Sequence, residues 1–184
     1  MNSVKPSFCA AHSRSVQSDN ASNAFNRNDL VVPVDRSGDA WTRYQYQAVF
    51  RLMPSDQSDM SDRMDSTFEL LLPGEYMAKD FRETFRAALT ADKSELPLRW
   101  FASPNLELMT TETERTARKI KLGQLAGVDM RFLTDKTHWP RLQAALSSSG
   151  ATLTFIDLNT PIPQRPEVLA RLPVDRTIDP DCRQ

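Results

Sequence analysis

Glycine, cysteine and histidine are scarce in this chain, and their scarcity argues against several kinds of functional site. Among 184 residues there are five glycines, two cysteines and two histidines. The glycines are spread one at a time, so the sequence has no glycine-rich loop of the kind that holds a phosphate. We therefore expect no metal, no cofactor and no catalytic residue, and the sequence predicts a protein that is not an enzyme.

A long apolar run is also missing. No stretch approaches the roughly 18 apolar residues of a membrane span, and the N-terminus lacks the apolar region of a secretory signal. We expect a cytoplasmic protein, or one exported without a classical signal peptide, and no membrane partner. Cys9 and Cys182 lie near opposite ends of the chain, and we interpret them as free thiols in a reducing compartment.

Two patterns invite a metal-binding interpretation, and neither has the required spacing. Cys9-x-x-His12 is half of a zinc site, whereas structural zinc sites use four ligands. The repeated Ser-Asp pairs in 54–66 lack the ligand spacing of an EF-hand loop, so a solvated acidic loop is the favoured interpretation.

Catalytic groups form no recognisable set. His138 lies three residues after Asp135, but one histidine beside one carboxylate does not make a catalytic triad, and the start of a helix is the favoured role for His138. We expect His138, Glu69 and Asp157 to be too scattered to share a substrate.

Charge is balanced overall but not locally. The chain has 23 basic and 24 acidic residues, a net charge of −1, which argues against a surface devoted to nucleic acid. The densest basic cluster nevertheless predicts an alternative function, nucleic-acid binding through a solvated face of the sheet. The residues of this predicted basic face are Arg99, Arg115, Arg118, Lys119, Lys121 and Arg131.

Composition divides the chain into three parts. Residues 1–40 are predicted to be a flexible polar arm, 41–158 a globular domain and 159–184 a proline-rich extended tail. The arm begins rich in serine and has no acidic residue before Asp19, which is similar to the export signals of bacterial type III effectors. This resemblance implies a further alternative, a secreted bacterial effector.

Hydrophobic periodicity predicts most of the secondary structure of the domain. Residues 41–53 alternate as a strand does, while 75–89 carry an apolar stripe at the helical period. Residues 67–72 and 151–158 are expected to be strands, and 138–147 a short helix capped by Thr137.

Residues 98–133 admit two interpretations. Apolar residues fall on even positions through much of the segment, which favours an antiparallel meander. The alternative breaks the segment into strands around a helix that starts near Glu112, which gives a ferredoxin-like β-α-β-β-α-β order. The favoured fold class is therefore α+β, a single domain with a mostly antiparallel sheet and two or three helices.

The poverty of catalytic groups and the two long polar ends predict a non-catalytic interaction or scaffold protein. Its arm, tail or sheet face would dock onto other proteins, so we expect a protein partner or self-assembly, with nucleic acid as a possible partner.

Overall fold

The computed structural model describes residues 27–53 and 66–170. Both cysteines, His12, most of the predicted arm, the Ser-Asp loop and the end of the predicted tail lie outside these residues. Asp29–Ile162 forms one compact unit, and the described residues outside it, 27–28 and 163–170, belong to a second, terminal unit. In the compact unit, Leu30 and Ile162 form an antiparallel bridge.

The centre of the compact unit is a parallel sheet. Its four strands lie in the order in which they occur in the chain, with β1 beside β2, β2 beside β3 and β3 beside β4. The strands are β1 (Thr67–Glu69), β2 (Leu98–Ala102), β3 (Asp129–Thr134) and β4 (Thr152–Asp157). Parallel neighbours need crossover connections, and each crossover here contains a helix.

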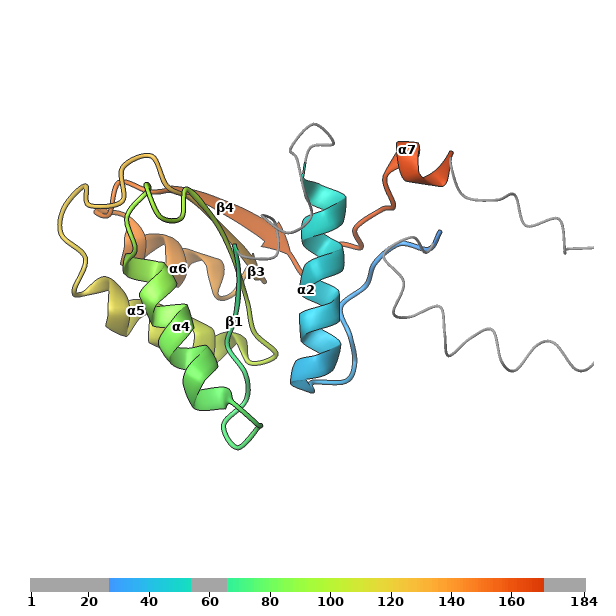
Figure 1. The fold of residues 1–184 in the computed structure, drawn as a ribbon, viewed down its shortest axis with the longest axis horizontal. Helices are drawn as coiled ribbons and strands as arrows, with labels where there is room; N and C mark the ends of the chain where they lie inside the picture. The colour runs from blue at the N-terminus through green and yellow to red at the C-terminus, as the bar shows by residue number, and fades with distance from the viewer. Residues whose placement is uncertain (1–26, 54–65, 171–184) are drawn as a thin grey trace, which may run out of the picture. The chain divides into compact units, whose positions relative to one another are not determined.

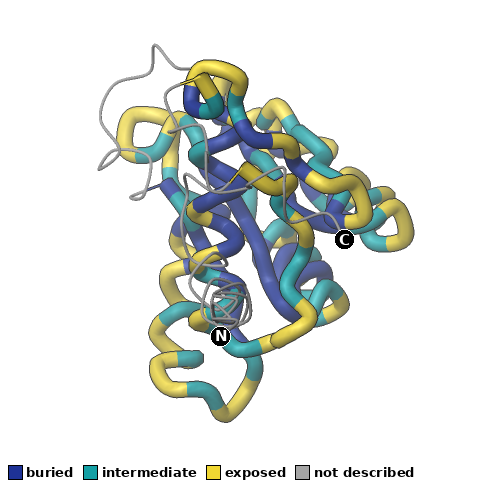
Figure 2. The backbone as a smooth tube through the Cα atoms, turned by 90° about the vertical axis from the view of Figure 1, so that its right-hand side faces the viewer, coloured by how far each residue is buried: buried dark blue, intermediate teal, exposed yellow. Residues whose placement is uncertain are grey.

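Helices cover both faces of this sheet (Figure 1). The three crossover helices pack on one face, and α2 (Gly38–Leu52), which precedes β1, packs on the other. The crossover helices are α4 (Ala78–Thr90), α5 (Leu106–Ala117) and α6 (Trp139–Leu146). Because both faces are covered, buried residues run through the middle strands, as Figure 2 shows, and the core has one layer on each side of the sheet.

The predicted antiparallel α+β fold is wrong, and so is the ferredoxin-like alternative. All four described strands are parallel, and the described residues form five helices, so the fold is α/β. The fifth helix, α7 (Pro166–Leu169), belongs to the terminal unit, where Arg165 pairs with Glu167. No helix among the described residues is both long and apolar enough to span a membrane.

The strand predicted over 41–53 is helix α2. Ser37 caps its N-terminus by accepting a hydrogen bond from the Ala40 amide at 3.4 Å. Its buried apolar residues follow a helical stripe and do not alternate, because Trp41, Tyr44, Ala48 and Val49 follow at intervals of 3, 4 and 1. Two glutamines in the buried surface concealed that stripe in the sequence.

The antiparallel meander predicted over 98–133 is β2, α5 and β3. Helix α5 starts at Leu106, where Asn105 accepts a hydrogen bond from the Leu108 amide at 3.0 Å. Its buried face includes three threonines and a glutamate, so the hydropathy of the segment does not follow the helical period. Thr110 satisfies its own hydroxyl by donating to the Leu106 carbonyl at 2.8 Å.

The other predicted elements are confirmed with small changes of boundary. Helix α4 begins at Ala78 and not at Glu75, because Met77 has φ 61°, a left-handed conformation that cannot belong to the helix. Glu75 lies in the preceding loop and accepts hydrogen bonds from the amides of Gly38 and Leu72, both at 2.8 Å.

Helix α6 and the strands β1 and β4 lie within the segments predicted for them. The predicted cap is wrong, because the residue before α6 is His138 and Thr137 makes no capping bond among the described residues; Asp135 accepts the amides of both residues instead.

Candidate functional site

A cleft of about 550 Å³ lies at the carboxyl ends of β2, β3 and β4. We call it the carboxyl-edge cleft. In parallel α/β sheets this edge is the usual place for ligands, because the loops that leave the strands converge there. Its lining residues are Val32, Pro33, Val34, Arg36, Trp41, Pro104, Asn105, Leu106, Glu107, Asp135, His138, Leu158 and Asn159.

The loop after β2 is fixed by hydrogen bonds within the fold. Ser103, which is fully buried, donates its hydroxyl hydrogen to the Leu70 carbonyl at 2.7 Å and accepts the Asn105 amide at 3.0 Å. Asn105 then caps α5. This sequence of bonds places Glu107 in the first turn of α5, where the helix dipole favours a carboxylate.

The loop after β3 fixes the imidazole of His138. One carboxylate oxygen of Asp135 accepts hydrogen bonds from the amides of Thr137 and His138, both at 2.9 Å, and from His138 Nδ1 at 2.8 Å. Burial works to raise the pKa of Asp135, but the hydrogen bonds from His138 and Thr137 outweigh it and the pKa is lowered. Because an ionised Asp135 can only accept, Nδ1 carries the hydrogen and Nε2 is the nitrogen that can take a proton.

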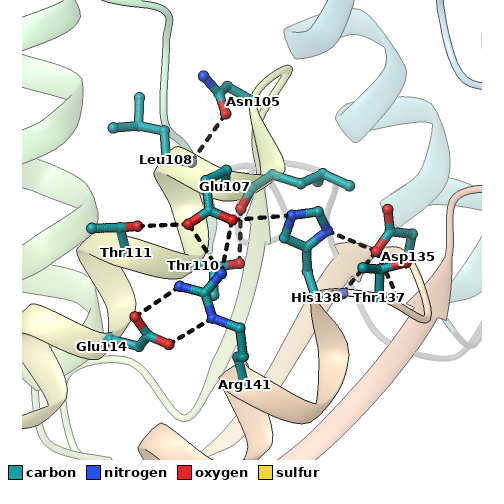
Figure 3. A network of polar contacts seen from close by, with 11 residues as sticks. Asn105, Glu107, Leu108, Thr110, Thr111, Glu114, Asp135, Thr137, His138 and Arg141 are labelled. Atoms are coloured by element: carbon teal, nitrogen blue, oxygen red, sulfur yellow. Dashed lines mark hydrogen bonds and ion pairs between the residues drawn. The ribbon is translucent and has the colours of Figure 1, made fainter.

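His138 Nε2 faces a second carboxylate across the cleft, as Figure 3 shows. It lies 3.5 Å from Glu107 Oε2, longer than a well-formed hydrogen bond. Glu107 is held instead by Arg141, whose Nη1 donates to both carboxylate oxygens at 2.7 and 3.0 Å. The hydrogen bond from Arg141 lowers the pKa of Glu107. Nε2 thus keeps the capacity to bind another group.

Arg141 also connects the two helices that frame this imidazole. It donates to both carboxylate oxygens of Glu114, at 2.9 and 3.0 Å, so one guanidinium on α6 joins two carboxylates of α5. Such paired contacts fix the orientation of the side chains as well as their distance. The position of Glu107 relative to His138 is therefore set by a connected network.

The α2 side of the cleft supplies hydrogen-bond donors. Arg36 is an exposed lining residue, and Trp41 is a buried one. The indole Nε1 of Trp41 is buried and has no acceptor among the described residues. A buried donor without a partner costs free energy.

The structure does not bring the six residues of the predicted basic face together. Arg99 is fully buried and donates to carbonyls at the end of α4, with Nη1 2.6 Å from the Ala88 oxygen. Arg131 pairs with Asp129 at 2.8 Å, and its guanidinium carbon lies 4.8 Å from the ring centroid of Trp100. These two arginines therefore have roles within the fold.

The other four residues of that set lie at or beyond the C-terminal end of α5. Arg115 and Lys119 line a second cavity, together with Arg86 of α4, and Arg118 and Lys121 are exposed. The predicted sheet face depended on the meander, so the parallel fold removes its geometric basis.

The three groups predicted to be scattered have different partners. Glu69 accepts from Thr42 of α2, Asp157 pairs with Lys136 at 3.6 Å, and His138 contacts Asp135 and Glu107. Sequence reasoning noted Asp135 beside His138 but missed Glu107. The available signal was that Glu107 and His138 each lie at the start of a helix that follows a strand. The meander interpretation concealed the first of these helices, α5.

No group of three or more histidine, cysteine, aspartate or glutamate residues in the described ranges could hold a metal ion. Comparisons with protein-family models, with curated proteins and with solved structures each found no match. The geometry of the carboxyl-edge cleft therefore carries the functional proposal for this chain.

Proposed function

We propose that this protein binds a small molecule in the carboxyl-edge cleft and exchanges a proton with it through His138. One observation carries the proposal. In a cleft of about 550 Å³ the imidazole is fixed at Nδ1 by Asp135, and among the described residues no close hydrogen bond holds its Nε2. Small-molecule sites commonly enclose about 300 to 1,000 Å³. The volume therefore suits a metabolite-sized ligand.

The lining indicates what kind of ligand fits. Apolar side chains alternate with polar ones, and the charged residues are Arg36 on one side and Glu107 and Asp135 on the other. A ligand with an apolar body and both donor and acceptor groups would satisfy this lining. The lining residues include no serine, cysteine or lysine, so the proposal requires no covalent step.

A binding screen with the full chain tests this proposal. Mixtures of small metabolites would be examined by ligand-observed NMR against the unaltered protein, His138→Ala and Lys136→Ala. His138→Ala removes the imidazole from the cleft, whereas Lys136 lies two residues away, outside the lining, and is 82% exposed. We expect at least one ligand whose affinity falls tenfold or more in His138→Ala and stays within twofold in Lys136→Ala.

Equal affinity in all three proteins would place the ligand elsewhere and reject the carboxyl-edge cleft. Absence of any ligand from a broad metabolite set would reject small-molecule binding. The melting temperature of each variant shows whether a loss comes from unfolding, and His138→Ala should fold because Asp135 keeps its bonds to the backbone amides.

Docking onto another protein is a second candidate, and the edge of the sheet favours it. Within the described residues β4 pairs only with β3, and every residue of β4 is partly or fully exposed. Its amides at alternate positions point toward β3, as Thr152 shows by donating to the Val128 carbonyl at 2.8 Å. The remaining amides are directed outward, and an added strand could pair with them.

Substitution at an outward amide tests docking through β4. Leu153→Pro removes an amide hydrogen on the open edge, while Thr152→Pro removes one that bonds to β3. If the protein self-associates through this edge, light scattering should show weaker association in Leu153→Pro at an unchanged fold. Thr152→Pro should lower the melting temperature. Association that survives Leu153→Pro would reject this edge.

A further inference from the structure

A second cavity, of about 320 Å³, lies between α4 and α5. We call it the helix groove. Its lining is Arg86, Ala87, Thr90, Arg115, Thr116 and Lys119, so every charged residue that lines it is a cation. It shares no lining residue with the carboxyl-edge cleft.

A buried carboxylate contacts two of the three cations of the helix groove. The side chain of Glu112 is 4% exposed, and Arg86 donates to one of its oxygens from Nε at 2.8 Å and from Nη2 at 2.6 Å. Arg115 Nη1 lies 3.7 Å from the other oxygen. One carboxylate thus holds two guanidiniums side by side, and each keeps further N–H groups for a ligand.

Charge does not cancel in the helix groove. Arg86, Arg115 and Lys119 supply three positive charges and Glu112 one negative charge, which leaves two positive charges around one cavity. No hydrogen bond or ion pair within the described residues engages the ammonium group of Lys119.

The dipoles of α4 and α5 would oppose an anion here, because both helices end beside the cavity. The fold offsets this at α4 with Arg99, which donates to the carbonyls of Ala88 at 2.6 Å and Ala91 at 2.5 Å. Gln124 donates to the Thr90 carbonyl at 3.2 Å. At α5, the Thr116 carbonyl accepts the Lys119 amide at 3.0 Å. These bonds reduce the partial negative charge that the two helix ends expose.

We propose that the helix groove binds the phosphate monoester group of a small molecule. A phosphate monoester carries a charge of about −1.5 to −2 at pH 7 and offers three acceptor oxygens, which matches two surplus positive charges and unused N–H donors. A nucleic-acid phosphate carries one charge and needs a row of cations along a strand. Here the cations converge on one concave site, which favours the monoester.

Calorimetric titration of the full chain with inorganic phosphate and with glycerol 3-phosphate tests this site. The double variant Arg115→Gln/Lys119→Gln removes two groove cations. The control Arg43→Gln/Lys79→Gln removes the same charge from exposed positions on α2 and α4. We expect at least tenfold weaker binding of both probes in the groove variant and a change within twofold in the control.

Two results would overturn the proposal. An equal loss of affinity for the phosphate probes in both double variants would show that binding depends on overall charge and not on the helix groove. Single-stranded DNA that bound more tightly than both probes, and lost that binding in the groove variant, would show a nucleic-acid site.

Lys119→Gln alone tests the site if the double variant unfolds, since Lys119 is exposed. Phosphate binding should be unchanged in His138→Ala, so this proposal stands or falls independently of the carboxyl-edge cleft.

Discussion

Thr42 on α2 donates its hydroxyl hydrogen to a carboxyl oxygen of Glu69 on β1. Glu69 is 5% exposed, and its other carboxyl oxygen is buried without a partner among the described residues. Burial raises the pKa of Glu69 to about 7, the hydrogen bond from Thr42 works against this, and the charges of Glu75 and Asp39 add to it. The charged groups that act on Glu69 are thus both carboxylates, one from α2 and one from the loop before α4.

Stability should fall as Glu69 loses its proton. Its pKa is higher in the folded protein than the 4.5 of an unperturbed glutamate, so the folded state binds more protons between these values. The free energy of unfolding should therefore decrease as pH rises from about 4.5 through about 7. Glu69→Gln removes this titration, and urea unfolding at pH 5 and pH 8 measures it. We expect the free energy of unfolding of Glu69→Gln, relative to that of the wild type, to be about 2 kcal/mol higher at pH 8 than at pH 5.

The control for this titration is Glu83→Gln on α4. It makes the same substitution at a side chain that is 63% exposed, outside the buried environment of Glu69. A constant difference between wild type and Glu69→Gln at both pH values would contradict a raised pKa.

Arg99 should be the most costly arginine to replace. It is fully buried and donates to the carbonyls of Ala88, Ala91, Asp92 and Leu96 at 2.5 to 3.0 Å. Arg99→Met leaves these carbonyls without their donor and should lower the free energy of unfolding by roughly 3 kcal/mol or more. Chemical denaturation measures this loss, and Arg118→Met, at an exposed position, should change stability by less than about 0.5 kcal/mol. Similar losses in both variants would show that the capping bonds contribute little.

The sequence allowed α4, α6, β1 and β4 to be predicted because their apolar residues fall on one period. It misled where buried positions are polar. Gln45, for example, lies on the buried side of α2 and donates to the Trp100 carbonyl at 3.0 Å, so the buried surface of that helix does not appear apolar in the sequence. A buried glutamine that bonds to a strand is a tertiary feature, and no local pattern reports it.

The candidate site was hidden for a related reason. His138 and Asp135 are neighbours in sequence and were noted together, whereas Glu107 reaches them only because β2 and β3 are parallel neighbours. An antiparallel meander would have placed the ends of those strands at opposite edges. Strand direction, which was predicted wrongly as mostly antiparallel, therefore decided whether the cleft could be foreseen.

Asp135 should stabilise the first turn of α6 through its backbone bonds. Asp135→Ala removes the acceptor for the amides of Thr137 and His138 and should lower the free energy of unfolding by about 1 kcal/mol. Asp135→Asn keeps an acceptor oxygen and should cost less. Thermal unfolding compares the two. An equal loss in both variants would mean that the charge, and not the backbone bonds, supplies the stability.

Two glycines with similar backbone angles should differ in how well they tolerate alanine. Gly74 has φ 95° and Gly150 has φ 84°, so either substitution forces an L-residue into the left-handed region at about 1 kcal/mol. A Cβ added at Gly74 would meet nothing within 4 Å. A Cβ added at Gly150 would lie 3.1 Å from Gly123 Cα and 3.3 Å from the Ala126 nitrogen. These are backbone atoms of a turn that bonds to the segment after α6, with the Leu125 amide 2.8 Å from the Ser149 carbonyl. Gly150→Ala should therefore cost about 1 to 2 kcal/mol more than Gly74→Ala in urea unfolding, because the turn must move. Equal costs would show that only the φ angle matters and that this turn yields freely.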